Sequence, residues 1–240
     1  MTVLLLGATG KTGALVAQQL LQQGFQIRLI VRSKARLDQT LLDHTSVSII
    51  VAQVYELSPE QLAQHVCDCE AVISCLGHNL TWAGIYGRPR DLVSAVIKRL
   101  CTAIASLQPI EPIKLILMSS SGVQNLQQQE RVSLLHRAVI SVLRFMLPPH
   151  KDNEQAVNYL QGLDKQTAAS IEWVAVRPDS LIQRESTTGY LSYASPQYDA
   201  LFKPQQTSRI NVAHFMVSLL ISSSLWQRWK YEMPVIYDQK

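Results

Sequence analysis

TVLLLGATGKTGALVAQQLL, residues 2–21, is the stretch that decides the fold of this 240-residue chain. The apolar run over 2–6 is too short for a helix, and its continuous apolar character is typical of a central strand buried on both faces of a sheet. After Gly13, apolar residues recur at helical spacing. The stretch therefore predicts a strand, a glycine-rich turn and a helix.

Three glycines shape the predicted turn. Gly7 permits a tight turn, Gly10 lets a ligand approach the backbone without meeting a Cβ atom, and Gly13 lets the helix lie close to the strand. A helix that follows such a turn directs free backbone N–H groups and the positive end of its dipole at one point. That arrangement suits a pyrophosphate.

A P-loop is the main alternative reading of this turn, because Gly10-Lys11-Thr12 imitates its last residues. A P-loop also requires a glycine five residues before the glycine of its Gly-Lys pair, and Leu5 stands there. The nucleoside triphosphatase class is therefore disfavoured. The spacing of the glycines also differs from the commoner dinucleotide fingerprint, whose first two glycines are two residues apart.

The sequence Gly-Ala-Thr-Gly-Lys-Thr-Gly over 7–13 resembles the glycine motif of the extended and atypical short-chain dehydrogenase/reductases, Rossmann-fold proteins that bind NAD or NADP. The resemblance implies an α/β fold, a doubly wound and mainly parallel sheet with helices on both faces, and a small C-terminal substrate region. We expect one domain over 1–240, with 183–208 as an irregular substrate-side segment. The turn residues expected to bind the cofactor are Gly7, Thr9, Gly10, Lys11, Thr12 and Gly13.

Composition and charge narrow the function classes. Hydrophobic residues make up 47% and charged residues 17%, as in ordinary globular proteins. The net charge of +4 comes from scattered basic residues, which disfavours a nucleic-acid partner. We expect a small-molecule substrate, and a monomer or homodimer.

Neither a membrane span nor a metal site is expected. Polar residues interrupt the apolar stretch 210–226, which predicts a buried amphipathic helix, and the chain start lacks a secretory signal pattern, so we expect a cytoplasmic protein. The four cysteines lack metal-site spacing and are expected to be reduced, mostly buried packing residues.

Arginine at the end of the second predicted strand, 26–31, indicates the cofactor type. NAD-specific Rossmann proteins place a carboxylate there to bind the ribose 2′-hydroxyl. This chain has Arg32, with Lys34 and Arg36 close behind, and no carboxylate before Asp38. We therefore predict NADP, with Arg32 on the 2′-phosphate or adenine and Lys34 or Arg36 assisting. The alternative is a solvated basic turn.

The remaining periodicity predicts further strands and helices. Strands are expected at 47–51, 70–77, 113–118, 171–178 and 233–237. Helices are expected at 59–66, 91–107, 131–147 and from about 150 through Tyr159.

The ends of the fourth and fifth strands should border the cofactor, because ligands bind where the strand order of a Rossmann sheet reverses. Leu76 and Gly77 end the fourth strand. The long irregular stretch that follows contains Trp82 and Tyr86, which we expect either to stack on a flat substrate or to pack against a helix.

Serines follow the fifth strand, at a position where the resemblance implies a hydrogen bond to a substrate carbonyl. Ser120 is the first candidate, Ser121 the second, and Ser119 is expected to border the cofactor. The alternative is that these hydroxyls only cap the next segment. The Tyr-x-x-x-Lys pair of ordinary short-chain dehydrogenases is missing, since Tyr159 is followed four residues later by Leu163.

The region of the missing pair resembles the atypical branch, the NmrA-like and flavin- or biliverdin-reductase-like proteins. There His150 or Lys151 could supply a proton or hold the ribose, or could be solvated residues at a helix start. The next predicted strand resembles that branch in its tryptophan and Val-Arg-Pro sequence. This resemblance implies that Pro178 borders the cofactor and that Asp179 closes the nicotinamide pocket on the substrate side.

Two functions from different classes follow. The first is an NADPH-dependent oxidoreductase that reduces a small flat acceptor such as a quinone, flavin or carbonyl compound. The alternative is a non-catalytic NADP(H)-sensing regulator of the NmrA-like type, which suits the missing Tyr/Lys pair. A sugar-nucleotide epimerase is a weaker third option, because the lost tyrosine argues against it.

Overall fold

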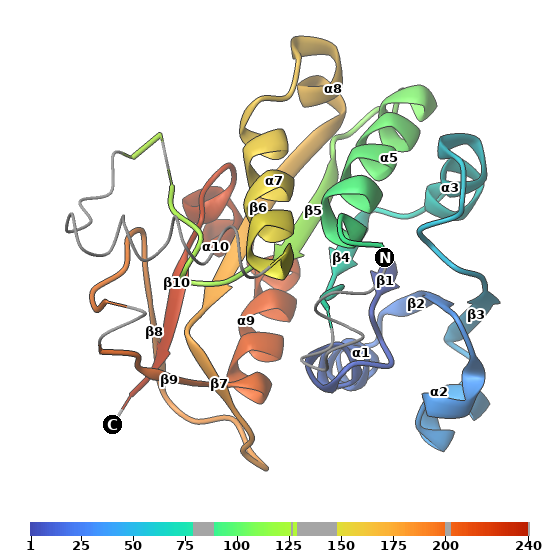
Figure 1. Ribbon diagram of the computed structural model, residues 1–240. Helices are drawn as coiled ribbons and strands as arrows, with labels where there is room; N and C mark the ends of the chain where they lie inside the picture. Colours follow the sequence, from blue (N-terminus) through green and yellow to red (C-terminus); the bar gives the residue numbers. More distant parts are fainter. Residues whose placement is uncertain (79–88, 126, 129–147, 200–202, 240) are drawn as a thin grey trace.

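The computed structural model describes residues 1–78, 89–125, 127–128, 148–199 and 203–239 (Figure 1). Trp82, Tyr86 and the helix expected over 131–147 lie outside these residues.

An eight-stranded sheet forms the centre of the molecule, in the order β3-β2-β1-β4-β5-β6-β10-β8 (Figure 1). Its first seven strands are parallel, and β8 pairs antiparallel with β10. The predicted doubly wound α/β fold is therefore confirmed, with its reversal of strand order between β1 and β4. In chain order the strands are β1 (Thr2–Leu6), β2 (Gln26–Val31), β3 (Val47–Val51), β4 (Ala71–Ser74), β5 (Ile113–Met118), β6 (Ile171–Pro178), β8 (Tyr190–Tyr193) and β10 (Val235–Asp238).

Helices cover both faces of the sheet. Alternate residues of β1 show the division, since Val3 and Leu5 belong to the core cluster with α1, α9 and α10, whereas Leu4 and Leu6 belong to the cluster with α3, α5 and α7. The helical elements are α1 (Lys11–Gln22), η1 (Lys34–Arg36), α2 (Gln39–Asp43), α3 (Pro59–Val66), α5 (Leu92–Leu107), α7 (Pro148–Gln161), α8 (Lys165–Ser170), α9 (Arg209–Ile221) and α10 (Ser223–Trp229).

Two expectations for the C-terminal part were wrong in detail. The stretch 210–226 is two helices and not one, because Ser222 ends α9 and its hydroxyl caps α10 by accepting from Leu225 N–H at 3.2 Å. The segment 183–208 is not wholly irregular. It contains β8 and the short strand β9 (Gln206–Ser208), which pairs in parallel with β7 (Ser180–Ile182).

The four cysteines carry free thiols, as expected. Cys67 is exposed and the other three are buried. Burial raises the pKa of Cys75 and of Cys101 to about 12 and that of Cys69 to about 11, which leaves these thiols protonated and unreactive. Within the described ranges, no helix has the length and apolar character needed to cross a membrane.

Arg177 ties the C-terminal strands to the end of β5. This fully buried side chain donates from Nε to the Met233 carbonyl at 2.7 Å, from Nη1 to the Val123 carbonyl at 2.9 Å and from Nη2 to the Ala194 carbonyl at 3.0 Å. Met233 lies just before β10, Val123 lies after β5, and Ala194 lies directly after β8. The guanidinium thus fixes the backbone on which the serines after β5 stand.

We predict that Arg177→Met lowers the free energy of unfolding by about 3 kcal/mol or more, because it leaves buried carbonyls without a donor. Urea denaturation followed by circular dichroism measures the loss. The matched control is Arg228→Met, which removes an exposed guanidinium stacked on Trp229 and should cost about 1 kcal/mol or less. Equal losses in the two variants would contradict the prediction.

Candidate functional site

The glycine turn between β1 and α1 is built on backbone contacts that leave no room for side chains. Gly7 has a φ of +83°, and a Cβ there would lie 2.6 Å from the Cys75 carbonyl oxygen. A Cβ on Gly13 would lie 2.2 Å from the Gly7 carbonyl oxygen. Gly10 N–H donates to that same oxygen at 2.9 Å, which closes the turn. The turn therefore lies directly against the end of β4, and α1 lies close to β1.

The first turn of α1 has no side-chain cap. Gly10 is its N-cap residue and supplies no side chain, whereas Ser58 caps α3 and Asp164 caps α8. The first amides of a helix have no intrahelical partner, so those of Lys11, Thr12 and Gly13 are available to an anion. Lys11 is exposed beside them, Thr12 is buried and Thr9 is half-buried.

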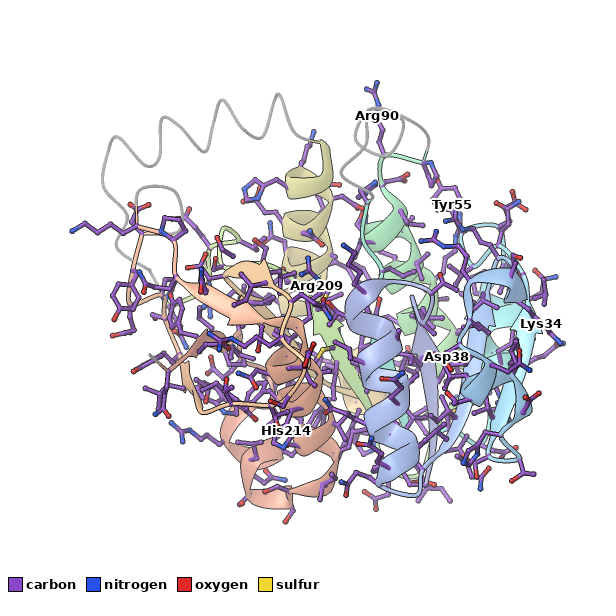
Figure 2. All side chains as sticks on the ribbon, turned by 90° about the horizontal axis from the view of Figure 1, so that it is seen from below. Lys34, Asp38, Tyr55, Arg90, Arg209 and His214 are labelled. Carbon is purple, nitrogen blue, oxygen red and sulfur yellow. The ribbon has the colours of Figure 1, made fainter. Side chains whose placement is uncertain are left out.

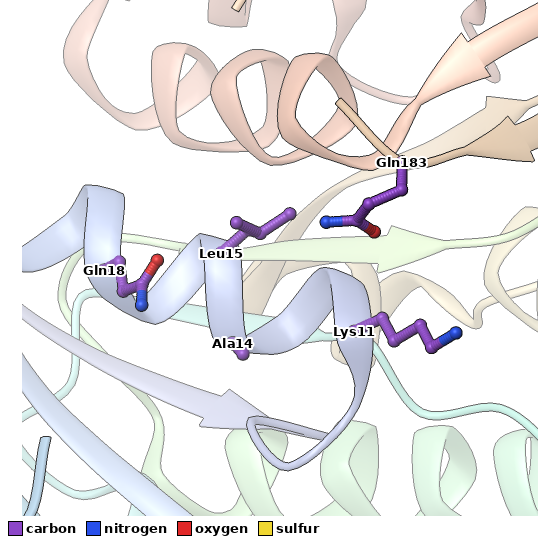
Figure 3. Close-up of a pocket in the computed structure, with 5 residues that line it drawn as sticks. All are labelled: Lys11, Ala14, Leu15, Gln18 and Gln183. Carbon is purple, nitrogen blue, oxygen red and sulfur yellow. The ribbon is translucent and has the colours of Figure 1, made fainter. Parts of the chain in front are cut away.

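A groove of about 380 Å³ lies between α1 and the segment after β7 (Figure 3). Lys11, Ala14, Leu15, Gln18 and Gln183 line it. It shares Lys11 with the glycine turn but includes none of the serines after β5. The groove therefore adjoins the glycine turn and does not coincide with the predicted reaction site.

The end of β2 presents three exposed basic residues, Arg32, Lys34 and Arg36, the last two in η1. Asp38 is the first carboxylate that follows in the sequence. It caps α2 and accepts hydrogen bonds from the Thr40 N–H at 2.9 Å and the Thr40 hydroxyl at 2.7 Å. These two bonds lower the pKa of Asp38. Lys34 and Asp38 lie on one side of α1 and His214 on the other (Figure 2).

The ends of β4 and β5 lie side by side next to the turn, because β4 stands between β1 and β5 in the sheet. Leu76 is half-buried and packs on the core cluster of α3 and α5. Gly77 is exposed, and a Cβ there would have no atom of the described residues within 4 Å. The described backbone after β4 therefore reaches the surface at Gly77.

The three serines after β5 have different surroundings. Ser119 is buried, and its hydroxyl has no hydrogen-bond partner in the part of the chain that the structure describes. Ser120 is half-buried and accepts a hydrogen bond from Gly122 N–H at 3.2 Å. Ser121 is buried, and its N–H donates to the Pro178 carbonyl at 3.0 Å.

Ser120 and His150 are brought together at Gly122. A Cβ on Gly122 would lie 3.5 Å from the Ser120 Oγ and 3.4 Å from the His150 Cε1. The His150 imidazole at the start of α7 and the Ser120 hydroxyl after β5 thus lie around the same glycine. Lys151 is the next residue of α7 and is exposed.

Tyr159 does not reach this group. It belongs to the core cluster beneath α5 and α7, with the Lys98 ammonium 5.8 Å from its ring centroid. Burial raises its pKa.

Asp179 is buried, and both its carboxylate and its backbone N–H form hydrogen bonds. Its carboxylate accepts from Gln205 N–H at 3.0 Å, and its own N–H donates to the Thr207 hydroxyl at 3.3 Å. Burial raises its pKa, which the hydrogen bonds from Gln205 and the Ser121 side chain partly offset. Asp179 therefore joins the serine loop to the β7–β9 pair.

Sequence reasoning missed one buried pair, His78 and Asp152. The Asp152 carboxylate lies 2.8 Å from His78 Nε2, and it accepts from Val93 N–H at 2.7 Å and Ser94 N–H at 2.9 Å. Burial alone would raise the pKa of Asp152, but the hydrogen bonds from His78, Ser94 and Val93 outweigh it, so the pKa is lowered. No sequence signal marks the pair, because its residues are 74 positions apart.

These features fit a dinucleotide. The turn would be filled by any Cβ at Gly7 or Gly13, and the first amides of α1 have no side-chain cap. The Ser119 hydroxyl, which has no hydrogen-bond partner among the described residues, lies at the end of β5. No cluster suited to a metal ion occurs in the described parts of the chain.

Known proteins share both sequence and fold with this chain. Averufin oxidase A of Aspergillus flavus is 26% identical over 200 residues, which cover 79% of this chain and 68% of the fungal protein. A chloroplastic protein of Arabidopsis thaliana is 34% identical over 73 residues, 30% of this chain and 26% of the plant protein.

Two solved structures show the same fold. A short-chain dehydrogenase/reductase of Veillonella parvula, crystallised with NADP, superposes with a TM-score of 0.72 at 18% identity and covers 99% of this chain and 94% of its own. A candidate NADH-flavin reductase of Streptococcus pneumoniae gives a TM-score of 0.68 at 17% identity, with both chains fully covered.

The sequence model of the NAD(P)H-binding family matches residues 7–223, from the first glycine of the turn to the start of α10. This span includes the turn, the basic end of β2, the serines after β5 and the start of α7. The predicted NAD(P)-binding Rossmann protein is thereby confirmed, and the chain belongs to the NAD(P)H-binding family.

Proposed function

We propose that this protein is an NADPH-dependent oxidoreductase of the atypical short-chain branch that reduces a small flat acceptor such as a quinone, a flavin or a carbonyl compound. The observation that carries the proposal is the meeting of Ser120 and His150 at Gly122, beside the open glycine turn. A hydroxyl and an imidazole at the edge of a dinucleotide crevice can polarise and protonate an oxygen.

In this proposal three groups of residues, at the ends of five strands, bind the three parts of the cofactor. The amides that start α1 hold the pyrophosphate, the basic residues after β2 hold the 2′-phosphate, and the ends of β4, β5 and β6 border the nicotinamide. When bound, the reduced nicotinamide supplies a hydride. The residues in these roles are Gly7, Thr9, Gly10, Lys11, Thr12, Gly13, Arg32, Arg36, Leu76, Gly77, Ser119 and Pro178.

Ser120 acts as a hydrogen-bond donor to the acceptor oxygen. Its Oγ already accepts from Gly122 N–H, so one lone pair is occupied and the hydroxyl proton is directed elsewhere. A donor held in this way stabilises the negative charge that develops on an oxygen as hydride arrives at the acceptor.

His150 supplies the proton that completes the reduction, with Lys151 as the second candidate. Hydride and proton together give a hydroquinone, a dihydroflavin or an alcohol. Ser121 and Asp179 support the site from the substrate side, where Asp179 holds Gln205.

NADPH is preferred to NADH because the end of β2 is cationic. Three exposed basic residues there attract the dianionic 2′-phosphate, and Asp38 caps α2 with its carboxylate. The NADP complex of the Veillonella parvula protein and the oxidase and reductase names of the other relatives support a nicotinamide-dependent redox function.

We predict that Arg32→Ala weakens NADPH binding about tenfold to a hundredfold and leaves NADH binding nearly unchanged, because one charge-assisted contact to the 2′-phosphate is lost. Fluorescence titration with each cofactor measures both constants. Arg228→Ala, which removes an exposed arginine on α10, is the matched control and should change neither. Wild-type protein that binds NADH as tightly as NADPH would rule out the preference.

We predict that Ser120→Ala lowers kcat/KM for the best acceptor about a hundredfold, since one donor to the developing oxyanion is removed. NADPH affinity should stay at the wild-type level. The assay follows acceptor-dependent loss of NADPH absorbance with a panel of quinones, flavins and aldehydes. Ser106→Ala, at the far end of α5, serves as the control because its hydroxyl donates within its own helix, to the Ala103 carbonyl. Undiminished turnover in Ser120→Ala would reject the role of this hydroxyl.

The same assay separates the enzyme from an NADP(H)-sensing regulator, which the missing Tyr-x-x-x-Lys pair favours. A regulator would bind NADPH and show no acceptor-dependent oxidation across the panel.

A further inference from the structure

We propose that Asp152 is a positioning residue that holds the nicotinamide side of the site in shape through its hydrogen bond to His78. The inference rests on the proposed function and deepens it. It names a residue that does not touch the cofactor or the acceptor but holds in place the residues that do.

The Asp152 carboxylate joins three elements. It comes from α7, it accepts from the Val93 and Ser94 amides at the start of α5, and it meets His78 at the end of β4. Both side chains of the pair are buried, with exposed fractions of 4% for His78 and 0% for Asp152. A carboxylate with three partners in such surroundings is held far more rigidly than a surface ion pair.

Two of the joined elements, the segment after β4 and the start of α7, carry part of the proposed site. His78 lies two residues after Leu76, whose backbone N would be 3.0 Å from a Cβ on Gly7 of the glycine turn. Asp152 lies two residues after His150, so the two side chains leave α7 in different directions. One direction leads to the start of α5 and the other to Ser120. Fixing Asp152 therefore fixes the distance between the Gly77 backbone and the His150 ring.

The alternative is that Asp152 only caps α5. Both readings predict a loss of stability when Asp152 is changed, so stability cannot separate them. They differ at the cofactor, because a positioning role concerns the nicotinamide side alone, whereas the adenosine side is held by β2 and α1.

The test measures binding of two probes, NADPH and adenosine 2′,5′-bisphosphate, which lacks the nicotinamide half. For Asp152→Asn, we expect the Kd for NADPH to rise about tenfold and that for the bisphosphate to stay within about twofold of the wild type. Asp164→Asn is the matched control. Asp164 caps α8 in a similar way, because its carboxylate accepts from Gln166 N–H and Thr167 N–H at 3.0 Å each. The variant weakens this cap and should leave both dissociation constants unchanged.

A second pair of variants keeps the α5 cap intact and so covers the case in which Asp152→Asn does not fold. His78→Ala should repeat the tenfold loss for NADPH, and His78→Gln should restore most of the affinity, because a glutamine amide can donate from nearly the position of the imidazole Nε2. The inference is overturned if His78→Ala binds NADPH like the wild type, if both probes weaken equally, or if glutamine fails to rescue.

Failure of the inference and failure of the proposed function give different results. Wild-type protein that binds NADPH without turning over any acceptor contradicts the proposed reaction. The difference in binding between NADPH and the bisphosphate still tests the role of Asp152 in that case. If the wild type is active but the Asp152 and His78 variants bind NADPH and the bisphosphate with equal changes in affinity, only the inference is contradicted.

Discussion

The close approach of two backbones, at Gly7 and Gly13, is the contact on which the rest of the site depends. A methyl group at Gly13 would have to occupy the position of the Gly7 carbonyl, and one at Gly7 would collide with the end of β4. Because neither is present, α1 starts directly above β1 and its first amides open into the crevice between β1 and β4. Moving the helix outward by the width of a methyl group would move the anion site with it.

The starts of α1 and α5, two of the helices that begin at this edge of the sheet, are capped differently. The start of α1 is left to a ligand, since Gly10 provides no cap, whereas the start of α5 is filled internally by the Asp152 carboxylate. An uncapped helix start attracts anions, so filling one and leaving the other open restricts where a pyrophosphate can settle. The internal carboxylate also takes the place of the charge that a second ligand would bring.

Most of the fold could be predicted from local patterns in the sequence. Features that depend on residues distant in the sequence could not be predicted in this way. The strands at 26–31, 47–51, 113–118 and 171–178 begin and end as predicted, because parallel strands are short, mainly apolar runs bounded by turn residues. The helix at 59–66 starts at the Ser58 cap for the same local reason. The strands β8 and β9 and the His78–Asp152 pair depend on partners distant in sequence, which periodicity cannot show. The break at Ser222 is local, since its hydroxyl accepts from Leu225 N–H, but the apolar character of the chain continues on both sides of it. Residue types identified candidates such as Ser120 and His150, but only the fold brings them to Gly122.

The missing Tyr-x-x-x-Lys pair changes what the protein must contribute to a reduction. An alcohol dehydrogenase needs a strong proton donor because a simple ketone accepts hydride poorly, and a lysine that lowers the tyrosine pKa supplies that donor. On α7 the tyrosine present, Tyr159, is half-buried against the core cluster of α5 and α7, and burial raises its pKa. A hydroxyl oriented by the Gly122 amide and a neighbouring imidazole offer weaker acid catalysis but firm placement. Such a site suits acceptors that already stabilise negative charge, as quinones and flavins do, since for them alignment with the cofactor contributes more than proton donation.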